Sequence, residues 1–168
     1  MDDEDEGPNE LAQLRKGQAL VAMLNPLIRR SDCDAYAAAG IDAYAMELMP
    51  RISRAQSMDV LSSQANLAGY KAVLDATEEY DRALPMMMTA AGTIAPAKIF
   101  VMGAGVAGLQ AIATARRLGA VVSATDVRPV AKEQVQSLGA KFVMVEDEET
   151  AEAETAAGYA KEMSEEYQ

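Results

Sequence analysis

One stretch of this chain, AKIFVMGAGVAGLQAIATARRLGAVVSATD at residues 97–126, constrains its fold more than any other. A short apolar run ends at Gly103, and Gly105 and Gly108 follow it in the spacing GxGxxG. A strand that turns tightly into a helix needs no Cβ at the first glycine, close approach of a diphosphate at the second, and tight packing of helix on strand at the third. The stretch therefore predicts a βαβ unit that binds a dinucleotide.

The turn and the helix behind it, expected at residues 106–118, form the predicted pyrophosphate site. The unpaired N–H groups and the positive dipole end of the helix point at the turn, where a diphosphate can accept hydrogen bonds. The predicted contacts in this segment are Gly103, Ala104, Gly105, Val106 and Gly108. The alternative is that these glycines form only a βα turn of some other α/β protein.

The acid that follows the next strand indicates which dinucleotide is bound. Asp126 comes directly after an apolar strand expected at residues 121–125. Its carboxylate would accept hydrogen bonds from the ribose hydroxyls of adenosine and would repel a 2′-phosphate, which favours NAD over NADP. Arg128 lies nearby and could instead meet such a phosphate. The alternative to a cofactor role is that Asp126 is a solvated strand end.

The composition argues against several other functions. A formal net charge of −11 disfavours nucleic acid as a partner and gives no attraction to anionic lipid. The chain has no histidine, so we expect no zinc site, no Cys–His nucleophile and no bound metal. The acidic N-terminus is unlike a secretory signal, and Lys98 and the glycine turn interrupt the longest stretch of low charge. We therefore expect a soluble chain.

Periodicity and turn residues predict the remaining elements. They give a strand at 19–24, a helix at 32–39, a strand at 42–47, a long helix at 57–83, a linker at 85–96, a helix at 131–138 and a strand at 141–145. The fold class is therefore α/β. It comprises one βαβαβ half of a Rossmann-type, doubly wound parallel sheet and part of a second α/β domain, joined by the long helix.

The expected domains follow from this order. Residues 1–16 form an acidic head, 17–84 the C-terminal part of a first α/β domain with its connecting helix, 85–97 a linker, and 98–168 the first half of a nucleotide-binding domain. A complete doubly wound sheet would need roughly three more strands. We therefore expect this chain to be an internal piece of a larger protein.

Three segments together resemble one family. They are RISRAQSMDVLSSQANLAGYKAVL at 51–74, PMMMTAAGT at 85–93 followed by GAGVAGLQAIATARRLGA at 103–120, and ETAAGYAKEM at 154–163. They look like domain I, the NAD(H)-binding component, of the proton-translocating NAD(P) transhydrogenases, which are related to alanine dehydrogenase. The match runs from about residue 40 to the end and is far more specific than the glycine motif.

The resemblance implies an activity and its partners. NADH bound to this chain would pass a hydride to NADP bound on a separate domain, in an enzyme of the Re/Si-specific type. A membrane subunit would couple the transfer to proton translocation. The implied partners are thus the NADP-binding domain, the membrane subunit and a second copy of this chain in a homodimer. The implied location is the cytoplasmic side of the inner membrane, peripheral through the partner subunit.

The resemblance also assigns roles to individual residues. Arg51, Gln56 and Asp59 fall on the loop that positions the nicotinamide and its ribose, and Ser62 on the residue that holds the carboxamide. Transfer of a hydride between two nicotinamides moves no proton, so placement of the rings is needed and not an acid or base. The other implied cofactor contacts are Ile52, Val127, Arg128, Gly158 and Tyr159.

Tyr159 falls on the tyrosine of the family's mobile loop, which closes over bound NAD. The chain departs from the family pattern beside it, because Ala157 stands where a second glycine is expected next to Gly158. A purely structural interpretation of the earlier loop also remains. There Asp59 caps the long helix, Arg51 is a loop cation, and Gln56 pairs with Ser53 in a capping box.

Two other functions remain as alternatives. A soluble alanine dehydrogenase-like oxidoreductase would deaminate an amino acid and would need a general acid/base and a carboxylate clamp. The absence of histidine counts against it. The other alternative is a truncated NAD-binding module without activity.

Overall fold

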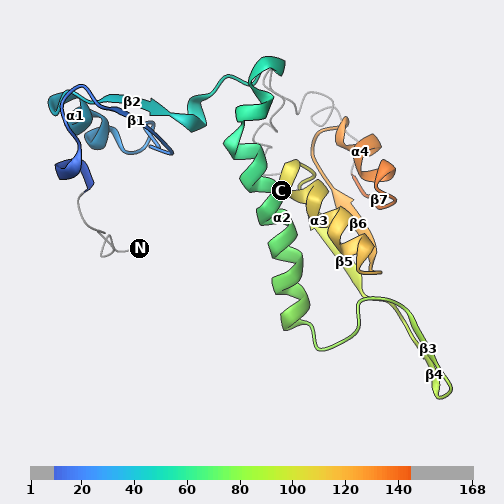
Figure 1. The fold of residues 1–168 in the computed structure, drawn as a ribbon. Helices are drawn as coiled ribbons and strands as arrows, with labels where there is room; N and C mark the ends of the chain where they lie inside the picture. Colours follow the sequence, from blue (N-terminus) through green and yellow to red (C-terminus); the bar gives the residue numbers. More distant parts are fainter. Residues whose placement is uncertain (1–9, 145–168) are drawn as a thin grey trace. The chain divides into compact units, whose positions relative to one another are not determined.

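The computed structural model describes residues 10–144, and Figure 1 shows their path. The chain divides into two compact units, with the boundary between Leu61 and Ser62. Both units contain parallel strands connected by helices. The predicted α/β class is therefore confirmed.

The first unit contains a pair of parallel strands joined by a helix. The register pairs Ala19 with Asp42 at one end and Ala22 with Ala45 at the other. Its elements are η1 (Glu10–Gln13), β1 (Ala19–Ala22), α1 (Arg30–Ala38), β2 (Asp42–Ala45), η2 (Met46–Leu48) and η3 (Ser53–Met58). The first strand was predicted to be buried, but Val21 is 61% exposed because only two strands pair in the described part of this unit.

The second unit contains the predicted βαβαβ arrangement. Strands β5, β6 and β7 are parallel and lie side by side in that order. The elements of this unit and of the helix that enters it are α2 (Val60–Glu79), β3 (Met87–Thr89), β4 (Gly92–Ile94), β5 (Lys98–Met102), α3 (Val106–Arg117), β6 (Val121–Thr125), α4 (Ala131–Ser137) and β7 (Lys141–Phe142). The predicted strand at 121–125 is confirmed at both ends, whereas β7 is shorter than predicted.

The core of the second unit lies between the helices and the parallel sheet. Ile112 and Ala115 of α3 are fully buried, and so is Ala124 of β6. Val135 of α4 and Val73 of α2 belong to the same cluster. These residues recur at helical or alternate-strand spacing, so the apolar pattern of the sequence determines which faces meet.

Helix α2 is shorter than the predicted helix at 57–83. Ser53–Met58 forms a separate 3-10 helix, and Asp59 adopts an extended conformation (φ −75°, ψ 90°) that interrupts the helical path. A Cβ added at Gly69 of α2 would lie 2.0 Å from the carbonyl oxygen of Ala107 in α3. The two helices therefore cross with their backbones in contact, which requires glycine. In the described part of the chain, α2 included, no helix combines the length and apolar composition that a membrane span needs.

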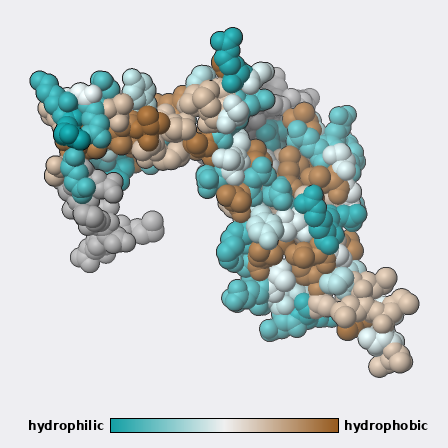
Figure 2. All heavy atoms as spheres, viewed as in Figure 1, coloured by the Kyte–Doolittle hydropathy of each residue, from teal (hydrophilic) through white to brown (hydrophobic). Residues whose placement is uncertain are grey.

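An antiparallel hairpin stands where the sequence predicts only a linker. Strand β3 pairs with β4, Met87 opposite Ile94 and Thr89 opposite Gly92. Every residue from Pro85 to Ala95 is exposed, and the hairpin projects at the lower right of Figures 1 and 2. The sequence interpretation missed both strands because alternation of apolar and polar residues, its signal for an exposed strand, is absent here.

Candidate functional site

The glycine turn joins β5 to α3 in the geometry that the motif predicts. Gly103 has φ +90°, a conformation that side chains with a Cβ rarely adopt. A Cβ added at Gly108 would lie 1.8 Å from the carbonyl oxygen of Gly103, so the first turn of α3 packs directly on the end of the strand. At Gly105, which precedes α3, an added Cβ would meet no atom within 4 Å. Each glycine therefore meets a different requirement.

Asp126 ties the end of β6 to this turn. Its Oδ2 accepts a hydrogen bond from the backbone N–H of Ala104 at 2.7 Å. The residue is only 7% exposed, so the interpretation of Asp126 as a solvated strand end is wrong. A further backbone bond, from Gly103 N–H to the carbonyl oxygen of Thr125 at 2.9 Å, continues the β5/β6 ladder up to the turn.

Arg128 occupies the remaining hydrogen-bonding capacity of the Asp126 carboxylate. Its Nε donates to Oδ1 and its Nη2 to Oδ2, both at 2.9 Å, and its backbone N–H donates to Oδ1 at 2.8 Å. Each oxygen thus accepts two hydrogen bonds, the most that its lone pairs allow. A ribose hydroxyl that binds Asp126 must therefore displace one of these donors.

The charge of Asp126 is stabilised in spite of its burial. Burial by itself would raise the pKa of the carboxyl, but the hydrogen bonds from the Arg128 side chain and from the backbone of Arg128 and Ala104 outweigh it and lower the pKa below the ordinary 3.8. The group is therefore ionised at neutral pH.

This pKa predicts a specific pH dependence of stability. A carboxyl whose pKa is lowered by folding stabilises the protein fully above its unfolded value, and loses that contribution as the pH falls through the folded value. Asp126→Asn should therefore lower the free energy of unfolding by about 1 to 2 kcal/mol at pH 7. The difference from the unmutated chain should shrink below pH 3.8. Urea unfolding followed by circular dichroism at a series of pH values measures it, and a pH-independent difference would contradict the assignment.

The residues of the predicted nicotinamide loop lie on and around η3 in the first unit. Gln56 is exposed on η3, and Arg51 is exposed shortly before it. The buried Ala55, 5% exposed, anchors the same short helix. Ile52 occupies the position before η3 and makes no side-chain capping bond. Ser53 is therefore already inside η3, which argues against a capping box formed with Gln56.

The remaining predicted residues are divided between the units and the undescribed part of the chain. Asp59, half-buried, ends η3 in the first unit, and Ser62, also half-buried, lies in the first turn of α2. Val127 is half-buried between Asp126 and Arg128. Gly158 and Tyr159 lie outside the described residues. The structure therefore brings together the glycine turn, Asp126 and Arg128, and the nicotinamide loop is described within its own unit.

An open groove of about 490 Å³ lies elsewhere on the second unit, and of the predicted site it includes only Val106. It is lined by Asn66, Val106, Leu109, Gln110, Ala113, Arg117, Gln134, Ser137 and Leu138 of helices α2, α3 and α4. Among residues 10–144, no cluster of histidine, cysteine or acidic side chains could hold a metal ion.

The sequence interpretation missed two residues that shape the site regions. Gly69 allows the contact between α2 and α3, and a glycine inside a long helical pattern was the available signal, since it costs about 1 kcal/mol relative to alanine. Glu47 binds two backbone amides of a distant loop. The signal for it was weaker, an acid at the end of an alternating strand.

Comparison with known proteins finds relatives over both units. Residues 5–68 match the family described as alanine dehydrogenase/PNT, N-terminal domain, and residues 72–163 match alanine dehydrogenase/PNT, C-terminal domain. The chain is 63% identical over 163 residues to the first of the polypeptides that make up the NAD(P) transhydrogenase alpha subunit of Rhodospirillum rubrum. That alignment covers 97% of this chain and 42% of the Rhodospirillum rubrum polypeptide.

Solved structures give the same result. A crystal structure of transhydrogenase from Sinorhizobium meliloti matches with 71% identity and a TM-score of 0.81, over 84% of this chain and 41% of that one. An L-alanine dehydrogenase structure matches in fold, with 22% identity and a TM-score of 0.63, over 80% of this chain and 38% of that one.

The chain spans about two fifths of the length of the relatives it matches, 42% for the polypeptide from Rhodospirillum rubrum. The resemblance to transhydrogenases inferred from the three sequence segments is confirmed, because the matches extend over both units and reach 63% identity. The chain therefore belongs to the alanine dehydrogenase/PNT family.

Proposed function

We propose that this chain is the NAD(H)-binding component of a proton-translocating NAD(P) transhydrogenase. The observation that carries the proposal is the glycine turn closed by Asp126, in a chain 63% identical to a transhydrogenase alpha subunit. The bound NADH supplies the hydride, which passes to NADP⁺ on a partner domain. The chain's own residues bind the nucleotide, orient its nicotinamide and exclude other reactions.

The glycine turn fits a bound dinucleotide. The space beside Gly105, which a Cβ would fill, allows a pyrophosphate to approach the backbone at the N-terminus of α3. The N–H groups of the first turn of that helix are donors without helical partners, and the helix dipole favours a negative charge there. Gly103, Ala104, Gly105, Val106 and Gly108 would therefore hold the pyrophosphate.

The pairing of Asp126 with Arg128 supports selection of NAD(H) over NADP(H). The Arg128 guanidinium already donates twice to Asp126. A 2′-phosphate would have to pull Arg128 away and would then meet the bare carboxylate of Asp126. A ribose hydroxyl can replace one donor without bringing a negative charge, and Val127 lies between the two paired residues in position to contact the adenosine.

Arg51, Gln56 and Asp59, with Ile52 beside them, would orient the nicotinamide and its ribose, and Ser62 its carboxamide. In line with the sequence, none of these side chains needs to act as an acid or base, because the transferred species is a hydride. Gly158 and Tyr159 would close over the bound nucleotide. The partners are then an NADP-binding domain and a membrane subunit, which would hold the chain at the cytoplasmic side of the inner membrane.

The domain division follows the same proposal. Residues 17–84 would complete a first α/β domain and its connecting helix, and residues 98–168 would begin the nucleotide-binding domain, after an acidic head at 1–16 and the segment 85–97. The alanine dehydrogenase-like alternative has the same fold. It has no histidine in this chain to act as its acid or base.

The transfer itself is the decisive test. For this, the sequence is extended to the length of its relatives with the corresponding residues of the Rhodospirillum rubrum polypeptide, and the product is called the extended protein below. With a transhydrogenase NADP-binding domain added, deuterium from C4 of labelled NADH should be found at C4 of NADPH, with none from the solvent. The transfer should survive a strong chelator. Label from solvent, or NADH formation that depends on alanine and not on NADP, would reject the proposal.

We also propose that the extended protein is a homodimer in which the hairpin of β3 and β4 contacts the second copy. A two-stranded hairpin is marginally stable on its own, and this one exposes Met86, Met87, Met88 and Ile94 by 41 to 78%. Between Pro85 and Ala95 there is no charged residue. Two copies that each carry a net charge of −11 repel one another least where they meet through an uncharged surface.

The place of the hairpin agrees with this partner. The hairpin ends just before the amino end of β5, where Ala97 N–H donates to the carbonyl oxygen of Leu84. The glycine turn follows the carboxyl end of the same strand, about 17 Å away for a strand of this length. A second copy on the hairpin would therefore leave the nucleotide side open to the NADP-binding domain.

A charge placed on the hairpin should dissociate the dimer. Met88→Asp puts a carboxylate on the side chain that is 78% exposed, and sedimentation should show a monomer at concentrations where the unmutated extended protein is dimeric. Leu67→Asp, at a site 60% exposed on α2, adds the same charge elsewhere and should leave the dimer intact. A dimer that survives Met88→Asp would show that the second copy binds another surface.

A further inference from the structure

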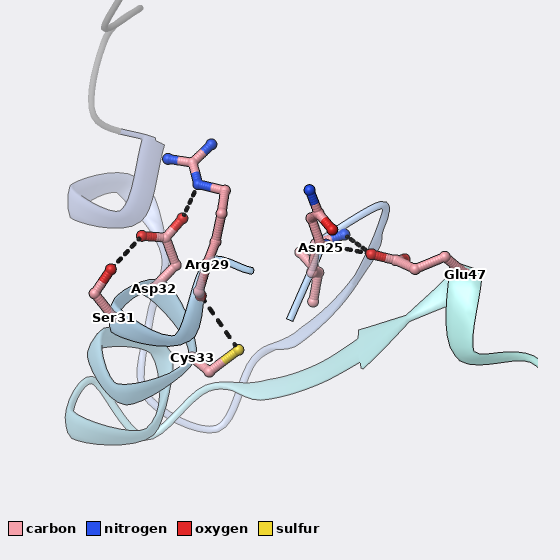
Figure 3. A network of polar contacts seen from close by, with 7 residues as sticks. Asn25, Arg29, Ser31, Asp32, Cys33 and Glu47 are labelled. Carbon is pink, nitrogen blue, oxygen red and sulfur yellow. Dashed lines mark hydrogen bonds and ion pairs between the residues drawn. The ribbon is translucent and has the colours of Figure 1, made fainter. Parts of the chain in front are cut away.

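A carboxylate joins the two loops at the carboxyl end of β1 and β2. Glu47 lies in η2, directly after β2, and its Oε1 accepts a hydrogen bond from Leu24 N–H at 2.8 Å. The same oxygen accepts from Asn25 N–H. Leu24 and Asn25 belong to the loop that follows β1. Figure 3 shows Glu47 reaching from its own element toward Asn25.

The loop that Glu47 binds has an unfavourable backbone conformation. Asn25 has φ +50°, and among the described residues it is the one non-glycine residue with positive φ. Leu24 is nearly buried, at 9% exposure. The carbonyl oxygen of Asn25 in turn accepts from the N–H groups of Ile28 and Arg29, at 3.1 and 2.9 Å. A conformation of this kind persists when surrounding contacts hold it in place, and Glu47 supplies two of them.

The same glutamate stands at the start of the nicotinamide loop. From Glu47 the chain passes through a succession of tight turns, in which Met49 N–H donates to Met46, Ile52 N–H to Pro50 and Ala55 N–H to Ile52, at 2.9 to 3.2 Å. Each turn is set by the one before it. A shift of η2 would therefore move the whole segment 51–59, and with it Gln56.

The electrostatics fit a fixed, ionised carboxylate. The backbone N–H of Glu47 itself lowers the pKa of the carboxyl, burial opposes this, and the N–H groups of Asn25 and Leu24 lower it further. The other oxygen, Oε2, is buried and has no hydrogen-bond partner within residues 10–144. The interaction with the loop therefore depends on a single oxygen, which an amide side chain also possesses.

We propose that Glu47 is a positioning residue for hydride transfer, which holds the loop after β1 against η2 and thereby fixes the segment 51–59 that presents Gln56. The inference rests on the proposed function. Ligands bind at the carboxyl ends of parallel strands in α/β proteins, and β1 and β2 are parallel. Glu47 itself need not touch the nucleotide, because it acts through the backbone.

Three substitutions of Glu47 and one matched control test this in the extended protein. Glu47→Ala removes the acceptor, Glu47→Gln keeps an oxygen for both amides, and Glu47→Asp shortens the side chain. The control is Gln18→Ala, because Gln18 Oε1 accepts from Arg15 N–H at 3.1 Å before the amino end of β1. It removes a similar side-chain to backbone bond at the opposite end of the same strand.

Two measurements are made on each variant, single-turnover hydride transfer beside NADH affinity, and amide hydrogen exchange. Glu47→Ala should slow transfer about tenfold or more, since a misplacement of ~1 Å can cost a hundredfold, with the NADH dissociation constant changed less than about twofold. Glu47→Gln should recover most of the rate. Exchange in residues 51–59 should rise in Glu47→Ala and stay unchanged in Gln18→Ala.

The outcomes separate this inference from the proposed function. If the unmutated extended protein transfers no hydride, the proposed function fails, and exchange in residues 51–59 still decides the role of Glu47. The inference is overturned if Glu47→Ala transfers normally, if Glu47→Gln is as slow as Glu47→Ala, or if Gln18→Ala has the same effects. If Glu47→Ala does not fold, Glu47→Asp must show the slower transfer, and a normal rate in that variant overturns the inference.

Discussion

Gly105→Ala is expected to weaken NADH binding to the extended protein by at least about a hundredfold, or about 2.8 kcal/mol, and to leave its thermal unfolding midpoint nearly unchanged. A Cβ at this position would meet no protein atom within 4 Å, and its backbone (φ −75°, ψ −167°) suits alanine. The methyl group would instead occupy the space that a pyrophosphate needs. Isothermal titration with NADH and a thermal melt without nucleotide measure the two effects.

Gly108→Ala is the matched control, with the opposite signature. Its Cβ would lie 1.8 Å from the carbonyl oxygen of Gly103, a backbone atom that cannot move without displacing the turn. Overpacking of this kind costs about 1 to 3 kcal/mol of folding free energy. If both alanine variants lost affinity and stability together, Gly105 would be a structural residue and the pyrophosphate would lie elsewhere.

Gln56→Asn is expected to slow hydride transfer about a hundredfold while the NADH dissociation constant stays within about twofold. The substitution keeps the amide and withdraws it by one methylene, so that the nicotinamide is misplaced by ~1 Å and the approach of the two rings is disturbed. The pyrophosphate and adenosine contacts lie on the glycine turn and Asp126, which the change does not touch. Single-turnover transfer beside equilibrium NADH binding, both in the extended protein, distinguishes the two steps.

Gln64→Asn makes the same chemical change on an exposed position of α2 and should affect neither measurement. Parallel losses of binding and transfer in Gln56→Asn would indicate a structural role for Gln56 in η3. No loss in either would mean that the role implied by the family does not apply to this residue.

Short-range steric rules explain why the nucleotide half was predicted well. A turn at Gly103 and close packing at Gly108 follow from the absence of Cβ, and the structure has both features. The strand at 121–125 was placed at its observed limits because β-branched residues and a preceding glycine mark it clearly. Such signals lie within a few residues of the elements they determine.

Features that depend on distant or exposed residues were not predictable in the same way. Glu47 binds amides more than twenty positions earlier in the chain, which no local pattern encodes. The hairpin exposes methionines on both sides of its turn, so apolar alternation could not reveal it. Asp126 and Arg128 were weighed as opposing signals for the phosphate, whereas they form one ion pair at 2.9 Å.

That ion pair changes what binding of a nucleotide means energetically. In the empty site the Asp126 carboxylate already has four donors, from the side chain and backbone of Arg128 and from Ala104. The arrival of a ribose is therefore an exchange of partners and not the rescue of a bare charge. The net gain is the difference between two similar hydrogen bonds, a fraction of the 1 to 3 kcal/mol (roughly) that an unsatisfied buried group would yield. A carrier that must release oxidised nucleotide after every transfer benefits from such a shallow well, because tight retention would limit turnover.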